Sequence, residues 1–188
     1  MFTVKITLDF EYSYVNHPNL VTILHNGEQK WHNRLKQKQI IIFADVDTGP
    51  QTLEVCLSDK TDADTIVDEN NAIVEDSFIV LKNIEIDGYM MRSVINSAMS
   101  QKIDWTQNTG AYEYIKAQGK DPDTELEHSN MLSLNGSLVF NYQYPVAKWL
   151  LQQRNDQDQY MFNTLMKEEP ELLQEVKSLL DMEEPCAR

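Results

Sequence analysis

The chain has little of several residue types and motifs, and each shortage excludes a class of protein. Two cysteines in 188 residues, Cys56 and Cys186, are too few for a disulfide-rich scaffold and lack zinc-site spacing. Only six residues are glycine, and no phosphate-binding loop, dinucleotide fingerprint or Gly-x-Ser-x-Gly nucleophile motif is present. The longest apolar runs, such as residues 40–44, are far shorter than a membrane span. We therefore expect a soluble chain with no membrane partner.

Positive charge is also scarce. Sixteen Lys and Arg residues stand against 30 Asp and Glu residues, which gives a formal net charge of −14. Such a surface repels phosphate backbones, so we expect no nucleic-acid partner. The first eight residues alternate like a strand and lack the features of a cleaved signal, which predicts synthesis and folding in the cytoplasm.

Alternating polar and apolar residues dominate the first half of the chain. This pattern predicts strands over residues 2–10, 21–23, 39–46, 52–57 and 78–86, with a turn at Asn26-Gly27. A second hairpin is predicted over 131–144, with Asn135-Gly136 at its apex. Strands without helical crossovers favour a mainly β chain, an antiparallel β-sandwich of jelly-roll type with a C-terminal helical extension.

The predicted organisation is a sandwich domain over residues 1–144 and a helical tail over 145–188. Residues 89–130 are expected to be an irregular excursion with weak helices at 90–99 and 111–117. In the tail, one helix is predicted from Pro145 to about Arg154, a second after a cap at Asp156 and a third from Pro170. The third carries an apolar stripe for partner subunits, or for the chain's own sandwich, formed by Leu172, Leu173, Val176, Leu179 and Leu180.

The stretch from Asp59 to Asp76 is rich in carboxylates and has Lys60 as its one cation. Several carboxylates on a flexible backbone suit calcium, which takes six or more oxygen ligands. A solvated acidic loop that keeps a sheet edge from pairing wrongly is the alternative. The candidate metal ligands are Asp59, Asp62, Asp64, Asp68 and Asp76.

The strand-like segments on either side of this stretch resemble a known family. Residues 49–59 (GPQTLEVCLSD) and 76–88 (DSFIVLKNIEIDG) are similar to strands of the calcium-dependent xylan-binding carbohydrate-binding modules. The resemblance implies a jelly-roll sandwich with Asp59 and Asp76 at calcium-ligand positions. In the family, Arg-Asn follows the second Asp, where this chain has Ser77-Phe78.

Aromatic side chains offer a separate indication of sugar binding, because pyranose rings stack on exposed aromatic faces. The candidates in loop-like segments are Trp31, Trp105, Tyr112 and Tyr114. The four histidines are scattered, without metal-ligand spacing, and no acid, base and nucleophile grouping stands out. The sequence therefore predicts a protein that is not an enzyme.

Two functions remain, and both depend on contacts. The first is a structural or assembly protein, because an acidic sandwich with a helical tail is similar in style to small tailed-phage virion proteins. Its partners would be other protein subunits, in a homo- or hetero-oligomer. The second is a calcium-dependent carbohydrate-binding module with a glycan partner.

Overall fold

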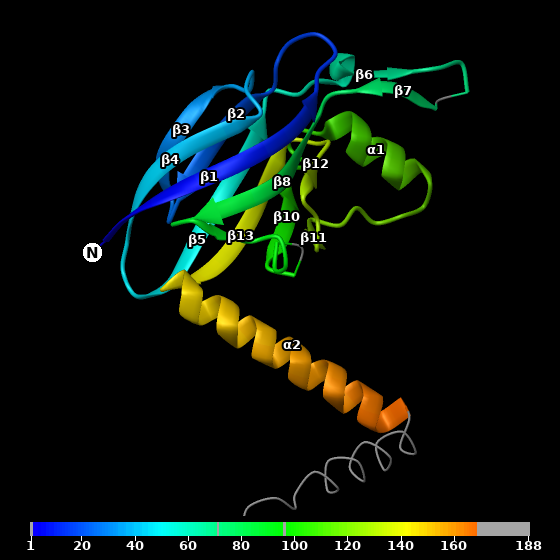
Figure 1. Cartoon of the computed structure of the whole chain (residues 1–188). Helices are drawn as coiled ribbons and strands as arrows, with labels where there is room; N and C mark the ends of the chain where they lie inside the picture. Colours follow the sequence, from blue (N-terminus) through cyan, green and yellow to red (C-terminus); the bar gives the residue numbers. More distant parts are fainter. Residues whose placement is uncertain (1, 71, 96, 169–188) are drawn as a thin grey trace, which may run out of the picture. The chain divides into compact units, whose positions relative to one another are not determined.

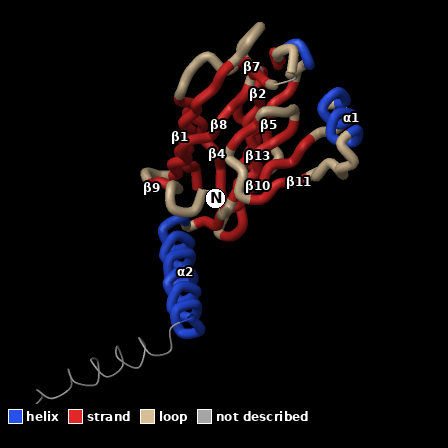
Figure 2. Tube along the Cα trace, turned by 90° about the vertical axis from the view of Figure 1, so that its right-hand side faces the viewer, coloured by secondary structure: helices blue, strands red, loops and turns tan. Residues whose placement is uncertain are grey.

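Two antiparallel sheets make up the body of the protein. A computed structural model describes residues 2–70, 72–95 and 97–168, apart from the side chains of 157, 158 and 161–168. The first sheet has the order β12 (Met131–Leu132), β8 (Phe78–Ile86), β1 (Phe2–Ser13), β4 (Gln39–Val46), and β9 (Tyr89–Met90) also pairs with β8. The second has the order β11 (Glu125–Glu127), β10 (Met99–Ile103), β13 (Gly136–Tyr144), β5 (Gly49–Ser58), β2 (Leu20–His25), β3 (Glu28–Arg34). The two sheets lie face to face (Figure 1), and the turned view separates the β1–β8 layer from the β13–β10 layer (Figure 2).

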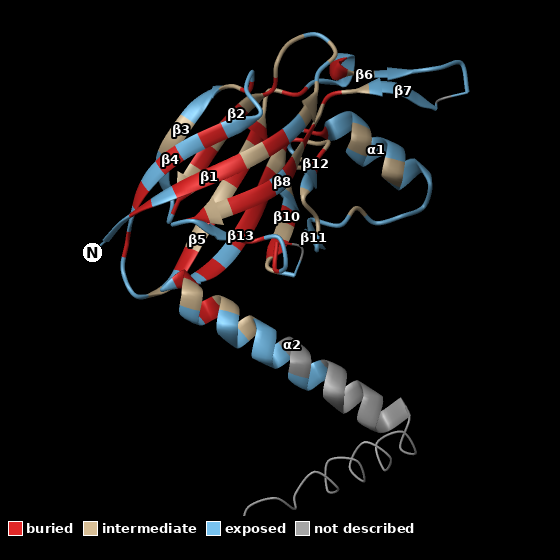
Figure 3. Cartoon of the chain, viewed as in Figure 1, coloured by how far each residue is buried: buried red, intermediate tan, exposed pale blue. Residues whose placement is uncertain are grey.

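The core lies between the sheets and follows from the alternation in the sequence. On β1, Ile6 and Leu8 are fully buried, and Ile6 is paired with Ile42 of β4. On the facing sheet, Val55 of β5 is paired with Leu138 of β13, and both are buried. Figure 3 shows this alternation as bands of buried and exposed residues along the strands. The predicted antiparallel β-sandwich is confirmed.

The β2–β3 hairpin forms as predicted at Asn26-Gly27. Both turn residues have positive φ, 50° at Asn26 and 79° at Gly27, the conformation that a two-residue hairpin turn of type I′ requires.

The hairpin predicted over 131–144 is wrong. β12 pairs with β8 in the first sheet, whereas β13 pairs with β5 and β10 in the second. The chain therefore crosses between the sheets at Asn135-Gly136 and does not turn back there. The crossing is fixed by hydrogen bonds of the buried Asn135 side chain to residues far away in the sequence, which no local pattern encodes.

Residues 89–130 hold more regular structure than expected. Residues 92–95 form turns in place of the expected weak helix, whereas the helix expected over 111–117 is present as α1 (Thr109–Ala117). Strand β10 lies inside the second sheet, between β11 and β13. Residues 89–130 thus supply β11 and β10, the two strands at one edge of the second sheet.

The acidic stretch contains a short hairpin of β6 (Thr65–Val67) and β7 (Ile73–Asp76), which pair only with each other among the described strands. A 3-10 turn, η1 (Asp62–Asp64), precedes it. The β6–β7 hairpin projects away from the two sheets (Figure 1).

The chain divides into two compact units, Met1–Ala147 and Lys148–Arg188. Helix α2 runs without a break over Val146–Glu168, so the predicted second helix start at Asp156 is wrong. No glycine or proline interrupts this segment, and its Gln and Arg residues favour a continuous helix. The predicted contact stripe of Leu172, Leu173, Val176, Leu179 and Leu180 lies outside the described residues. Within the described ranges, no helix has the length and apolar character needed to cross a membrane.

Gly136, at the start of β13, is the glycine whose replacement we expect to cost most. Its φ is 154°, and a Cβ added there would lie 2.1 Å from the Lys102 carbonyl oxygen of β10. Gly136→Ala should lower the free energy of unfolding by about 3 kcal/mol or more, measured by urea denaturation. Gly119→Ala is the control, because Gly119 also has positive φ but no heavy atom near its added Cβ; it should cost about 1 to 2 kcal/mol. Equal losses for the two variants would contradict this explanation.

Candidate functional site

An open trough that contains several polar side chains lies on the outer face of the six-stranded sheet. Its volume is about 460 Å³, within the range of small-molecule sites. Strands β5, β10 and β13 and the turn after β10 line it. The lining residues, which we call the trough, are Glu54, Cys56, Leu57, Ser58, Lys102, Ile103, Asp104, Gln107, Gly136 and Ser137.

The floor of the trough follows from the strand register. Ser137 of β13 is paired with Cys56 of β5 on one side and with Lys102 of β10 on the other. Paired residues point to the same face of a sheet, about 5 Å apart. An ammonium, a hydroxyl and a thiol therefore form one row across three strands.

The Cys56 thiol, at the β5 end of this row, is a weak nucleophile. Burial raises its pKa to about 12, and the neighbouring Glu54 carboxylate adds to the effect. Because only the thiolate is a strong nucleophile, a thiol with this pKa stays protonated at neutral pH and serves as a small polar surface.

One wall of the trough is the turn that carries Asp104 and Gln107. The Asp104 carboxylate accepts hydrogen bonds from the Thr106 hydroxyl at 2.5 Å, from the Thr106 amide at 3.0 Å and from Gln107 Nε2 at 2.7 Å. These bonds, that of the Thr106 hydroxyl first, lower the pKa of Asp104. The carboxylate is therefore ionised near neutral pH and fixed in place.

Asn135 ties this wall to the sandwich. It is 1% exposed, and its amide nitrogen donates to the Lys60 carbonyl at 2.7 Å and to the Gln107 carbonyl at 3.2 Å. Its side-chain oxygen accepts from the Lys60 amide at 2.9 Å. Its backbone nitrogen donates to Asn108 Oδ1, and its carbonyl accepts from Asn108 Nδ2 and the Asp104 amide. Three separate segments thus meet at one buried amide.

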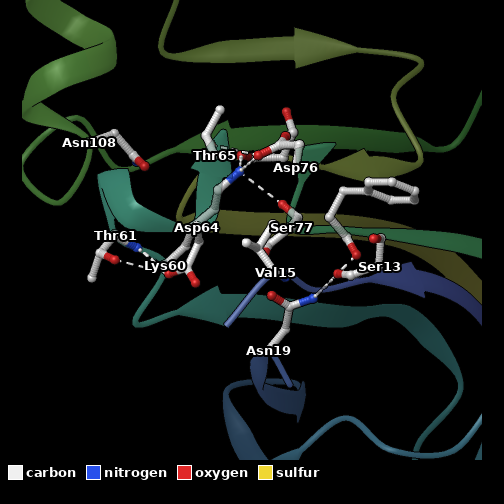
Figure 4. Close-up of polar contacts among 12 residues, drawn as sticks. Ser13, Val15, Asn19, Lys60, Thr61, Asp64, Thr65, Asp76, Ser77 and Asn108 are labelled. Atoms are coloured by element: carbon white, nitrogen blue, oxygen red, sulfur yellow. Dashed lines mark hydrogen bonds and ion pairs between the residues drawn. The ribbon is translucent and has the colours of Figure 1, made fainter. Parts of the chain in front are cut away.

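The Lys60 ammonium is the second part of this network (Figure 4). The side chain is 6% exposed and forms an ion pair with Asp76. Its Nζ donates to Asp76 Oδ1 at 2.5 Å, to the Ser77 carbonyl at 2.8 Å and to the Ser133 carbonyl at 2.5 Å. A buried ammonium needs such partners, because its unpaired burial would cost several kcal/mol.

Four of the five predicted metal ligands, Asp59, Asp64, Asp68 and Asp76, have a hydrogen-bonding or charged partner within the protein. Asp59 pairs with Arg34 and accepts from the Leu20 amide. Asp68 accepts from the backbone amides of residues 70 and 72, and the Asp62 carboxylate lies against Gly110 of α1. Asp76 binds Lys60 and the Thr65 hydroxyl.

Asp64 is 2% exposed and sits inside the network (Figure 4). Burial alone would raise its pKa, but hydrogen bonds from the Thr61 amide and hydroxyl and from Asn16 outweigh this effect and lower it. Its carboxylate is therefore committed to organising the η1 turn.

The residues present do not fit a calcium ion. Among the described residues, no group of three or more His, Cys, Asp or Glu side chains could hold a metal. At the two positions that the sequence resemblance implies as ligands, Arg34 already neutralises Asp59 and Lys60 already neutralises Asp76. Calcium binding stays a prediction that this arrangement of side chains does not support.

Two of the predicted aromatic ligand residues lie together. The rings of Trp105 and Tyr112 meet edge to face with centroids 5.8 Å apart, and Trp105 Nε1 donates to the Asp123 carbonyl at 2.9 Å. Trp105 lies between Asp104 and Gln107 of the trough wall. Trp31 is on β3, the opposite edge strand of the sheet, so the structure does not bring it to the other two. Tyr114 is exposed on α1.

Sequence reasoning missed the trough itself. The polar residues Thr52, Glu54, Cys56 and Ser58 alternate along β5 and could have identified its outward face. Their meeting with Lys102, Ser137 and Gln107 depends on pairing between strands far apart in sequence, which alternation does not encode.

We expect the Lys60 ion pair to be essential for stability. Lys60→Met leaves the Asp76 carboxylate without its ammonium partner and should lower the free energy of unfolding by about 3 to 5 kcal/mol in urea denaturation. Lys82→Met is the matched control, because Lys82 pairs with Glu11 where both side chains are more than half exposed, and should cost less than about 1 kcal/mol. Lys60→Met with Asp76→Asn should recover part of the loss. A cost for Lys60→Met no larger than that of the control would contradict the assignment.

Comparison with known proteins gives two similar structures. No protein-family model matches the chain, and no curated protein matches it. A solved structure described as vCBM60 in complex with galactobiose is 14% identical, covers 73% of this chain and 98% of its own, and has a TM-score of 0.42. A selenomethionine form of vCBM60, from work linking two families of calcium-dependent carbohydrate binding modules by circular permutation, is 15% identical, with 73% and 89% coverage and a TM-score of 0.43.

Proposed function

We propose that the protein is a non-enzymatic binding module that holds a glycan in the trough without a metal ion. The observation that carries the proposal is the row of hydrogen-bonding side chains that the strand register places across β5, β13 and β10, next to the Asp104–Gln107 turn.

The chemistry of the trough suits a carbohydrate. Each sugar hydroxyl is both a donor and an acceptor, and carboxylates, amides and hydroxyls satisfy both roles. The trough offers the carboxylates of Glu54 and Asp104, the ammonium of Lys102, the amide of Gln107 and the hydroxyl of Ser137. Two carboxylates and one ammonium leave the trough with a small negative charge, which favours a neutral oligosaccharide over a polyanion.

The rigidity of the wall supports the same proposal. Asp104 is held by three hydrogen bonds within its turn, and the turn is held by Asn135. Side chains that are already fixed lose little conformational entropy when a ligand binds.

The assembly function predicted from the sequence has less support. Its predicted contact stripe lies outside the described residues, and nothing in the described part indicates a virion. It stays a prediction.

The proposal is tested on a glycan array, followed by isothermal titration calorimetry with the most strongly retained neutral oligosaccharide. Glu54→Gln should weaken binding about tenfold or more, because it removes a charged hydrogen-bond acceptor. EDTA should leave the affinity unchanged, because in this proposal the trough side chains bind the sugar directly.

Glu85→Gln is the control, because Glu85 is also half-buried but lies on β8 of the other sheet. It should bind like the unaltered protein. Absence of any retained glycan, or equal affinities for the two variants, would overturn the proposal.

A further inference from the structure

The edges of the two sheets are not protected alike. Natural proteins keep sheet edges from pairing by making them short, charged or irregular. β12 and β9 have two residues each, and β11 has three, of which two are glutamates. β3 carries charged side chains and has a register shift against β2.

β4 has none of these protections. It is eight residues long, pairs with β1 without a register shift, and contains no proline, glycine, lysine or arginine. Its one charged residue is Asp45. Its outward side chains include Ile41, 47% exposed, and Phe43, 64% exposed, which appear as exposed bands along β4 in Figure 3. A long, regular, apolar edge strand of this kind pairs readily with another strand.

The backbone of β4 is oriented for such pairing. The Lys5 carbonyl accepts a hydrogen bond from the Asp87 amide, so the backbone groups of Lys5 point toward β8. Because neighbouring residues of a strand point their backbone groups in opposite directions, those of Ile6 point toward β4. Their partners on β4, such as Ile42 opposite Ile6, are therefore satisfied by β1. On β4, the backbone amides and carbonyls of the other residues point away from β1, in the plane of the sheet and beyond its edge; these are Gln39, Ile41, Phe43 and Asp45. No described strand is paired with β4 on that side.

We propose that β4 pairs antiparallel with β4 of a second copy of this chain, joining two sheets into one. In such a pair, residues whose backbone groups point away from β1 must lie opposite each other. One two-fold register then places Ile41 opposite Phe43 and Gln39 opposite Asp45. It forms about eight backbone hydrogen bonds, sets apolar side chains against each other and lets an amide donate to a carboxylate. The next register places Ile41 opposite Asp45, which sets an apolar side chain against a charge. The strand is therefore self-complementary in one alignment, which argues for a second copy over an unrelated partner strand.

Charge modulates this association. Each copy carries a formal net charge of −14, so two copies repel each other over a distance that salt shortens to about 8 Å at physiological ionic strength. On the face of β4 itself, Asp45 and Asp9, which is paired with Gln39, are accompanied by Lys5, which is paired with Phe43. We expect the dimer to be stronger at about 0.5 M than at about 0.05 M NaCl.

Sedimentation equilibrium of the full chain, up to about 200 µM, tests the proposal. The mass should double from 21.8 kDa, and Phe43→Lys should raise the dimer dissociation constant at least about tenfold. Ile73→Lys is the matched control, because Ile73 on β7 is 65% exposed, against 64% for Phe43, and should leave the constant unchanged. A chain that stays monomeric at this concentration, or equal effects of the two variants, would overturn the proposal.

Amide hydrogen exchange by NMR identifies the surface. In the dimer, the amides of Ile41 and Phe43 should be protected, and they should lose protection on dilution, whereas Ile42 stays protected because it is bonded to β1. In Phe43→Lys, protection of Ile42 reports that the sandwich is folded. Rapid exchange of Ile41 in a dimeric sample would place the contact elsewhere and overturn the proposal, which is independent of glycan binding.

Discussion

One buried cation, the Lys60 ammonium, holds together the end of the sandwich where residues 60, 76–77 and 133–135 meet. It is held by the Asp76 carboxylate and by the carbonyls of Ser77 and Ser133. Asn135 binds the backbone of the same residue through both atoms of its amide. A buried ammonium is tolerated only where such partners surround it, so these segments must adopt their positions together. The pair adds little net stability compared with an apolar core, but its partial loss is costly.

This network also shapes the trough. Strand β5 ends at Ser58, two residues before Lys60, and strand β13 begins at Gly136, directly after Asn135. Two of the strands that line the trough are therefore connected directly to the network. The third segment, the Asp104–Gln107 turn, is bound to Asn135 at both of its ends. The Asp104 amide donates to the Asn135 carbonyl, and the Asn135 side-chain amide donates to the Gln107 carbonyl. The positions of the hydrogen-bonding groups on the outer face of the sheet therefore follow from polar contacts buried at its end. Arg34 and Lys60 form ion pairs with Asp59 and Asp76, the two positions that the sequence resemblance assigns to calcium ligands.

Local patterns predicted the strands well and their partners poorly. β4 and β8 begin and end at the predicted residues, because β4 alternates cleanly between core and solvent and β8 departs from alternation only at Asn83-Ile84. The Asn26-Gly27 turn was equally predictable, since its backbone requirement is local. Asn135-Gly136 has a similar composition but marks a crossing between sheets, and its contact with Lys60 spans 75 residues. Carboxylate density likewise predicted a charged site in this region, but not that Arg34 and Lys60 would form ion pairs with Asp59 and Asp76.

Thermal unfolding in about 5 mM calcium chloride and in EDTA tests most directly whether Lys60 replaces a metal ion. A bound ion raises stability by mass action, which appears as a shift of several degrees in Tm. If the internal ammonium supplies the positive charge, the two melting curves should coincide within about 1 °C. A Tm several degrees higher in calcium than in EDTA would contradict this account.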